Sequence, residues 1–532
     1  MSSTLSPTLS PAPSPCSPDA PRRHVLVVGN GMAGARFAEE LRRRDAEVAI
    51  TVVGEEPHEA YNRVLLSTVV AGTIGPRETR LKPNGWWATH DVLVRAGIRV
   101  TALDVSARTA TLTAAAPDAG GVAAPEVLRW DELVLATGSD AFVPPIAGAA
   151  DDPSVIAFRT LDDAERLVTA AESAHHAVVV GGGLLGLEAA RGLLGHGVHV
   201  TVVHPAAHPM DRQLDHDGGA VLTRVVQGLG ARLALGRQVG ERRRATSEAP
   251  GAVVLDDGTE LPADLVVLAA GVRPRVDLAR AAGLDVGRGV VVDDRLGASH
   301  PHVHAIGECA EHRGEVPGLV QPGWDQARVL ADVLSGADPA ATYTGTSVVT
   351  RLKAPDVDLT SMGRVDVGVH DAGHEVLAFT DPVRGRYAKL VLRADRLVGA
   401  ILLGVGDAAG PLTQLYDTGA TAPRDRLALM LGRAVTRAGG AESVNLAEMP
   451  GGAVICRCNT VTKSAIVEAF RSGADTVPAV AEATRATTGC GSCASAVDGL
   501  CSWLRSAEPS VSPNTTLGRP EGQSEPLEEG AA

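Results

Sequence analysis

The sequence predicts an α/β fold in which two Rossmann-like dinucleotide-binding domains precede an α+β domain and a small helical module. Three observations carry this prediction. An apolar run, a glycine-rich loop, an amphipathic stretch and a second apolar run follow one another over residues 24–54, and the same pattern returns at 176–203. Two close pairs of cysteines stand near the end of the chain. At about 150 residues per domain, a chain of 532 residues has room for three or four domains.

The composition is typical of a globular protein outside the membrane. Hydrophobic residues make up 45% of the chain, and no run of 18 apolar residues occurs. The N-terminus lacks the apolar core of a signal peptide, so we expect a cytoplasmic location, reduced thiols and no membrane partner. The formal net charge of −14 argues against nucleic acid as the main partner. Residues 1–22 and 507–532 hold little that could be buried and are expected to be disordered.

The first glycine-rich loop contains Gly29, Gly31 and Gly34 between a strand-like run and a helix-like run. Glycines there permit a tight turn and let backbone N–H groups and the helix dipole meet a pyrophosphate. The second strand of the unit ends about 20 residues further on at Glu55, with Glu56 as the reserve, where a carboxylate can accept hydrogen bonds from a ribose. The alternative is a turn that only packs a helix closely on a strand.

The second glycine-rich loop contains Gly181, Gly183 and Gly186 and is followed by Glu188 on the same helix-like run. Its placement between strand and helix is that of the first loop, so it predicts a second dinucleotide site. The position after its second strand holds His204 instead of an acid. Since the missing carboxylate is the group that selects NADH over NADPH, the preference between these two stays open.

The chain from about 24 to 330 resembles the two-dinucleotide flavoprotein reductases. Beyond the glycines, the strings that carry this resemblance are Leu135–Gly138 (LATG), Ala269–Pro274 (AAGVRP), Ala305–Cys309 (AIGEC) and Tyr61–Arg63 (YNR). The family binds FAD in the first fold and NAD(P)H in the second. Disulfide reductases of the family carry a cysteine pair in the first long helix, and no cysteine occurs here between residues 17 and 308.

The resemblance implies roles for individual residues. Thr137 and Gly138 belong to the element that leads the chain past the flavin cofactor, and Gly307 and Glu308 to the element whose acid holds the ribityl chain, where most members have Asp. Arg63 corresponds to a motif that passes near the isoalloxazine ring, although a solvated surface arginine is an equal alternative. No protein nucleophile is expected, because the cofactors carry the chemistry.

The most specific feature of the chain is a set of four cysteines, Cys456, Cys458, Cys490 and Cys493. Four thiolates from two loops suit zinc or an iron–sulfur cluster. A flavin reductase has more use for a one-electron acceptor than for a redox-inert ion, which favours the cluster, with structural zinc and plain buried thiols as alternatives. Residues 452–504 also resemble the bacterioferritin-associated-ferredoxin (BFD) type of [2Fe-2S] module, in which these four positions are the ligands.

Together these features divide the chain between its two disordered ends. We expect the following domains: an FAD-binding domain at 23–145 and 275–336, an NAD(P)H-binding domain at 146–274, an α+β interface domain at 337–445 and a BFD-like [2Fe-2S] domain at 450–506. The third domain resembles the family's interface domain, which implies a homodimer as one option for its assembly.

The whole series over 24–504 resembles the N-terminal part of assimilatory NAD(P)H nitrite reductase large subunits and the electron-transfer subunits of assimilatory nitrate reductases. The residues behind this are Glu55–Ser67, Met210–Asp215 and Gly307–Gly314. The resemblance implies an oxidoreductase of nitrate assimilation that takes electrons from NAD(P)H and gives them to a nitrate or nitrite reductase subunit or a small electron carrier. The sirohaem domain of the nitrite reductases has no counterpart in the sequence, so nitrite reduction by this chain itself is not expected. The alternatives are a generic ferredoxin or rubredoxin reductase, a low-turnover redox-sensing flavoprotein and a zinc-stabilised flavoprotein oxidase.

Overall fold

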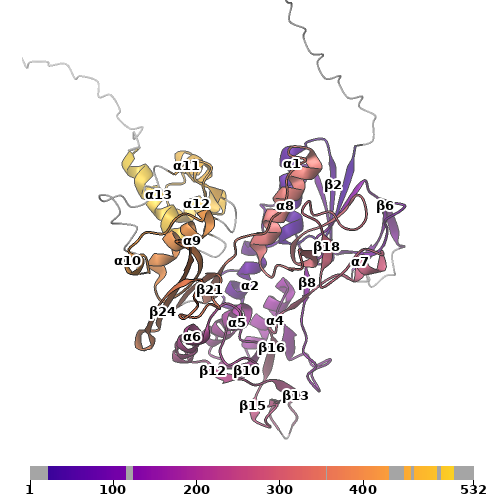
Figure 1. The fold of residues 1–532 in the computed structure, drawn as a ribbon. Coiled ribbons are helices and arrows are strands. Elements are labelled where there is room, and N and C mark those ends of the chain that lie inside the picture. Colours follow the sequence, from indigo (N-terminus) through magenta and orange to yellow (C-terminus); the bar gives the residue numbers. More distant parts are fainter. Residues whose placement is uncertain are drawn as a thin grey trace, which may run out of the picture. The chain divides into compact units, whose positions relative to one another are not determined.

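A computed structural model describes residues 22–115, 124–247, 249–354, 356–430, 449–456, 461–487 and 493–507. The chain forms two compact units, one up to Ala441 and the other from Glu442 onward (Figure 1). The expected disordered ends fall almost wholly outside the described residues. Within the described ranges, no helix combines the length and apolar character that crossing a membrane requires.

The first sheet of the larger unit is parallel throughout. Its strands, in spatial order, are β19 (Val303–Ala305), β7 (Glu132–Leu135), β1 (His24–Val28), β2 (Ala49–Gly54) and β3 (Val92–Ala96). The central strand is buried from both sides, with Val25, Leu26 and Val27 fully inaccessible, which explains its unbroken apolar run. Helices α1 (Met32–Arg44) and α8 (Val320–Ser335) lie side by side on this sheet (Figure 1).

Smaller elements complete this part of the unit. An antiparallel meander follows β3, and short helices and strands fill the connections: β4 (Ile98–Asp104), β5 (Thr109–Ala114), β6 (Glu126–Arg129), α2 (Leu66–Val70), α3 (Trp86–Thr89), α7 (Asp277–Ala281), β18 (Val290–Val292) and β20 (Ala310–His312).

The second sheet repeats the parallel arrangement. Its strands, in spatial order, are β12 (Arg232–Leu235), β11 (His199–His204), β10 (His176–Val180), β16 (Leu265–Leu268) and β9 (Val155–Ala157). The helices of this domain are α4 (Leu161–Ala171), α5 (Leu184–Gly195) and α6 (His216–Gly228), and its meander is β13 (Val239–Arg243), β14 (Ala252–Leu255) and β15 (Glu260–Pro262). The prediction of an α/β protein with two Rossmann-type domains is therefore confirmed.

Two antiparallel strands carry the chain between the two sheets. They are β8 (Ser139–Ala141) and β17 (Val272–Pro274), and Ser139 pairs with Pro274. Because the chain enters the second domain through β8 and leaves it through β17, that domain is an insertion in the first. The first sheet is completed only by β19, which follows the insertion in sequence.

The third part of the larger unit is an antiparallel sheet with helices against it. Its order is β21 (Val349–Ala354), β22 (Val357–Gly363), β25 (Arg396–Leu403), β24 (Arg386–Arg393) and β23 (Glu375–Asp381), and its helices are α9 (Ala409–Thr418) and α10 (Arg426–Met430). It meets the second domain at Asp215, the N-cap of α6, whose Oδ2 accepts hydrogen bonds from the Lys389 Nζ and the Tyr387 hydroxyl, both at 2.7 Å.

The described residues of the smaller unit form a two-stranded ribbon and three helices, namely β26 (Val454–Cys456), β27 (Val461–Thr462), α11 (Lys463–Arg471), α12 (Val477–Thr484) and α13 (Ala494–Ala507). Each helix supplies apolar residues to one core, among them the fully buried Ile466, Val480 and Val497. Thr462 and Thr476 cap the first two helices by accepting backbone N–H groups of the first turn.

Candidate functional site

The first glycine turn lies at the end of β1. Gly29 has a φ of +121°, and a Cβ there would overlap the Ala136 carbonyl, while a Cβ at Gly34 would overlap the Gly29 carbonyl. Gly31, the N-cap of α1, has no atom within 4 Å of the place a Cβ would take. The turn is thus closely packed at both ends and open at the helix N-terminus, which is the arrangement that receives a phosphate.

The second glycine turn, at the end of β10, has the same geometry. Gly181 has a φ of +117°, and a Cβ there would overlap the Ala269 carbonyl. Gly186 is packed against the Gly181 carbonyl, and Gly183, the N-cap of α5, is again open within 4 Å. Glu188, in the second turn of α5, is 9% exposed and has a polar partner.

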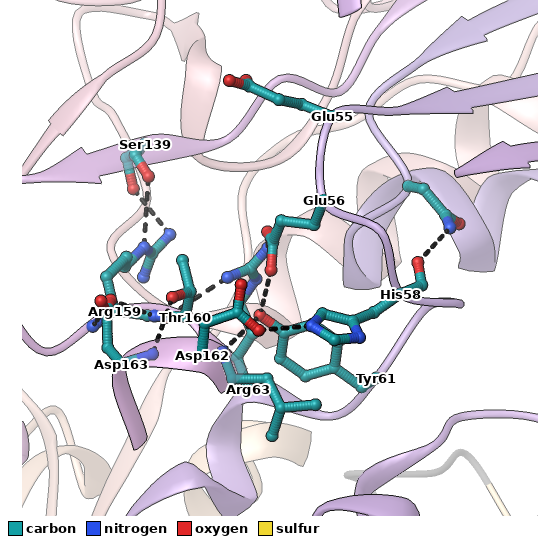
Figure 2. A network of polar contacts seen from close by, with 12 residues as sticks. Glu55, Glu56, His58, Tyr61, Arg63, Ser139, Arg159, Thr160, Asp162 and Asp163 are labelled. Carbon is teal, nitrogen blue, oxygen red and sulfur yellow. Dashed lines mark hydrogen bonds and ion pairs between the residues drawn. The ribbon is translucent and has the colours of Figure 1, made fainter. Parts of the chain in front are cut away.

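Glu55 comes directly after β2, and its carboxylate pairs with two arginines. Arg99 contacts Oε1, and the Arg275 Nη1 lies 2.9 Å from Oε2. In Figure 2 the Glu55 side chain points away from the cluster around its neighbour Glu56. Glu55, the acid chosen from the sequence, and Glu56, the alternative, therefore have different surroundings.

Glu56 belongs to a cluster with Tyr61 and Arg63. The Tyr61 hydroxyl donates to Oε2 at 2.5 Å, and Arg63 forms an ion pair with Oε1. Burial alone would raise the pKa of Glu56, but the charge of Arg63 and the two hydrogen bonds outweigh it and lower the pKa. Arg63 also donates to the Arg159 carbonyl and lies 4.9 Å from the Tyr61 ring centroid, so its guanidinium is fixed and is not a solvated surface group.

Glu308 is held by two residues that the sequence did not single out, Ser139 and Arg159, which Figure 2 shows in contact with each other. The Ser139 hydroxyl donates to Oε2 at 2.6 Å and itself accepts from the Arg159 Nη2 at 2.8 Å, and Arg159 also pairs with the Glu308 carboxylate. Ser139 follows the LATG string directly, which was a usable signal. Arg159 stands in a loop before α4 and matched no motif.

Thr137 and Gly138 lie where the chain crosses between the domains. The Thr137 hydroxyl donates to the Arg275 carbonyl at 2.8 Å, and the Arg275 N–H donates to the Gly138 carbonyl at 2.9 Å. Gly138 has a φ of +69° with open space around its missing Cβ. Arg275 therefore links the LATG string to Glu55.

A cleft of about 700 Å³ is lined by residues from the start of α5, from α8 and from the antiparallel sheet of the third part. Gln326, on α8, lines it and accepts the Gly307 N–H at 2.7 Å, while its buried Nε2 has no hydrogen-bond partner among the described residues. Gly307 lies against Ala33 in the first turn of α1. Leu184, the first residue of α5, lines the same cleft. An unsatisfied buried donor beside an open cleft suits a bound group with acceptor atoms, which the FAD predicted for this domain would supply.

His204 ends β11 with a buried side chain. Its Nδ1 accepts the Gly182 N–H at 3.1 Å, and its Nε2 lies 3.0 Å from the Asp211 carboxylate. Sequence analysis did not predict this contact, because it depends on how the loop after β11 folds back on the glycine turn.

The smaller unit buries two of the four predicted cluster ligands. Cys456 is 2% and Cys493 6% exposed, and both belong to the core shared by its helices. Cys458 and Cys490 lie outside the described residues. In the described part of the chain, no three His, Cys, Asp or Glu side chains form a metal site, and the four-cysteine set stays a prediction. Buried thiols presented by two separate segments are a donor set that suits an iron–sulfur cluster.

Cys309 is unlike these cysteines. It is fully buried, and its thiol donates weakly to the Ile306 and Leu135 carbonyls. Burial raises its pKa, although Thr137 and nearby backbone groups oppose this. A thiol kept protonated is a poor nucleophile.

Comparison with known proteins gives matches over most of the chain. The family described as "Pyridine nucleotide-disulphide oxidoreductase" matches residues 23–327. "Rubredoxin NAD+ reductase C-terminal domain" matches 349–413, and "BFD-like [2Fe-2S] binding domain" matches 454–502.

Among curated proteins, a nitrite reductase [NAD(P)H] of Bacillus subtilis is 35% identical over 89% of this chain and 56% of its own length. The assimilatory nitrate reductase electron transfer subunit of the same organism is 33% identical over 92% of this chain and 60% of its own length. The chain thus spans a little more than half of these relatives. Among solved structures, a putidaredoxin reductase–putidaredoxin complex matches with a TM-score of 0.68 and 25% identity, over 78% of this chain and 99% of that one.

Proposed function

The chain belongs to the pyridine nucleotide-disulphide oxidoreductase family, and we propose that it passes electrons from NAD(P)H to an assimilatory nitrate or nitrite reductase partner. It is an NAD(P)H-dependent flavoprotein oxidoreductase whose cofactors are FAD, NAD(P)H and, in the BFD-like domain, a [2Fe-2S] cluster. The acceptor rests on the names of relatives of which this chain spans a part.

The observation that carries the proposal is the pair of glycine turns with the same geometry in one unit. We assign the turn at Gly29–Gly34 to FAD and the turn at Gly181–Gly186 to NAD(P)H. Each presents an open helix N-terminus, which favours the negative charge of a pyrophosphate. The corresponding domains are 23–145 with 275–336 for FAD, 146–274 for NAD(P)H and 450–506 for the cluster.

Bound FAD would accept a hydride from NAD(P)H and release the two electrons singly, as a one-electron cluster requires. The protein's own residues hold the cofactors in position and take no part in the chemistry. Glu308, oriented by Ser139 and Arg159, is the acid proposed to hold the ribityl chain, and Arg63, fixed by Glu56, supplies a positive charge on the same side. Cys309, kept protonated, takes no part in the chemistry.

A small electron carrier is the second candidate for the acceptor. The match of residues 349–413 to a rubredoxin NAD+ reductase domain favours it. We also propose that two copies of the chain associate through the third domain, 337–445. Sedimentation measurements show whether the protein is a dimer.

The experiment is an anaerobic titration of the purified protein with NADH and with NADPH. Absorbance follows flavin bleaching, and low-temperature EPR follows the reduced [2Fe-2S] signal. We expect both signals together in the natural protein and bleaching without the EPR signal in a Cys493→Ser variant. Bleaching without any cluster signal in iron-replete natural protein would refute the relay. Addition of purified nitrate or nitrite reductase, or of a rubredoxin, then shows which acceptor reoxidises the flavin.

A further inference from the structure

We propose that Asp211, held in place by His204, makes the protein select NADH over NADPH. The inference rests on the assignment of NAD(P)H to the second glycine turn. In Rossmann domains the residue that ends the second strand is commonly an acid that accepts the ribose hydroxyls of NADH. Here that residue is His204, so the sequence alone leaves the selecting group unidentified.

The His204 ring cannot supply the negative charge, but it can present one. Its Nδ1 accepts the Gly182 N–H at 3.1 Å, so the ring proton sits on Nε2. Nε2 then donates to the Asp211 Oδ1 at 3.0 Å. The ring also packs on the glycine turn, since a Cβ at Gly182 would stand 2.9–3.1 Å from its atoms. The Asp211 carboxylate thus lies beyond the His204 ring, further from the end of β11 than an acid at position 204 would lie.

The backbone holds Asp211 beside the same turn. Met210, the residue before it, donates its N–H to the Gly182 carbonyl at 2.9 Å, and its side chain is 1% exposed. The loop after β11 is therefore fixed on the turn through Gly182. The Asp211 side chain remains 42% exposed, which leaves its carboxylate accessible to a ribose diol while one oxygen bonds to His204.

In the described part of the chain, Asp211 pairs with His204 and with no arginine or lysine. Arg237 bonds to the His204 carbonyl through its backbone, but its guanidinium is paired with Asp257 at 2.7 Å. Arg212 lines the cleft, and the His208 ring bonds to the carbonyl of its neighbour Pro209. A 2′-phosphate at this position would meet a carboxylate that no arginine or lysine pairs with in the described residues, which penalises NADPH.

Binding of two dinucleotide fragments to the FAD-loaded protein tests this without turnover. Calorimetry compares ADP-ribose with 2′-phospho-ADP-ribose, and steady-state kinetics with an artificial one-electron acceptor compare NADH with NADPH. We expect the natural protein to prefer the ligands without the phosphate. Asp211→Asn should reduce that preference about 10- to 100-fold, the range of one hydrogen bond to a charged group, and should act on KM with little change in kcat.

Two further variants separate position from charge. Asp217→Asn removes an exposed carboxylate from the first turn of α6 and should leave the preference unchanged. The double variant His204→Asp with Asp211→Asn puts an acid at the strand end and should restore the preference, as expected if His204 is a positioning residue.

The outcomes distinguish the role of Asp211 from the assignment of the second glycine turn to NAD(P)H. Equal binding of both fragments to the natural protein, or an unchanged preference in Asp211→Asn, overturns the role of Asp211 and leaves the second turn as the NAD(P)H site. Failure of both fragments to bind overturns the assignment of that turn itself.

Discussion

Asp215→Asn tests how the second and third domains are held together. Asp215 ends the loop before α6, and its Oδ2 accepts the Lys389 Nζ and the Tyr387 hydroxyl while Oδ1 accepts the Gly218 N–H at 3.0 Å. The Lys389 side chain is 5% exposed. Asn is as good an N-cap as Asp, and with its Oδ1 on the Gly218 N–H its Nδ2 can donate to the Tyr387 hydroxyl oxygen, so this substitution removes the charge and the acceptor that face Lys389.

The expected cost follows from the burial of Lys389. Once Asp215 is neutral, the Val365 carbonyl at 2.9 Å is the only partner that the ammonium keeps among the described residues. Breaking a buried ion pair by removing one partner costs about 3–5 kcal/mol, and the 20% exposure of Asp215 places the expectation near the lower end, at about 3 kcal/mol. The measurement is calorimetric unfolding of the FAD-loaded protein, in which the transition of these two domains should move to lower temperature.

A double variant shows whether the unpaired charge is the cause. Asp215→Asn with Lys389→Met leaves no buried charge, so most of the loss should be recovered. A loss below about 1 kcal/mol in Asp215→Asn, or a double variant no more stable than the single one, would refute the reasoning. Asp217→Asn, which removes an exposed charge two residues away, is the matched control.

The pH dependence of this pair has a defined sign. Burial alone would raise the pKa of Asp215, but the hydrogen bonds from Lys389 and Tyr387 lower it below its usual value. The stabilisation is then fully present above the unfolded-state pKa of about 3.9 and is lost as the pH falls through the lower folded-state value. The stability difference between the natural protein and Asp215→Asn should be constant near neutral pH and shrink below about pH 4.

Three further predictions concern the cofactors. Gly29→Ala should be purified with little flavin, because a Cβ at φ +121° overlaps the Ala136 carbonyl; the ratio of flavin to protein absorbance measures this, and a normal ratio contradicts it. Glu308→Gln should weaken FAD binding about tenfold through loss of a charged hydrogen-bond acceptor, seen as faster flavin release by fluorescence; unchanged release would exclude this acid from the site. Cys493→Ser should lose iron and acid-labile sulfide while retaining flavin, and full iron content would remove Cys493 from the ligand set.

Local patterns were the part of the fold that the sequence predicted well. A glycine turn between a strand and a helix depends on residues close in sequence, so the positions of Gly29–Gly34 and Gly181–Gly186 at the ends of buried strands followed from the pattern alone. The part of the chain expected to form an α+β domain, 337–445, likewise contains an antiparallel sheet with helices.

The sequence did not predict the contacts between residues that lie far apart along the chain. Ser139, Arg159 and Glu308 come from three distant segments, and only folding brings them together. Glu55 was chosen for its distance from the first glycine turn, yet its pairing with Arg99 and Arg275 depends on strands from other parts of the chain. No periodicity encodes such pairs, because they are set by how the sheets and crossings pack.

The position of β19 has a consequence for the order in which the protein is made. Val303 pairs with Leu133, and the whole second domain lies between them in sequence. A ribosome therefore releases every strand of the inserted domain before the outermost strand of the first sheet exists, so the inserted domain can fold while its host still exposes the edge of β7. Nascent chains arrested before residue 303 should bind a holdase chaperone more strongly than chains arrested after α8, because in the longer chains β19 covers the edge of β7.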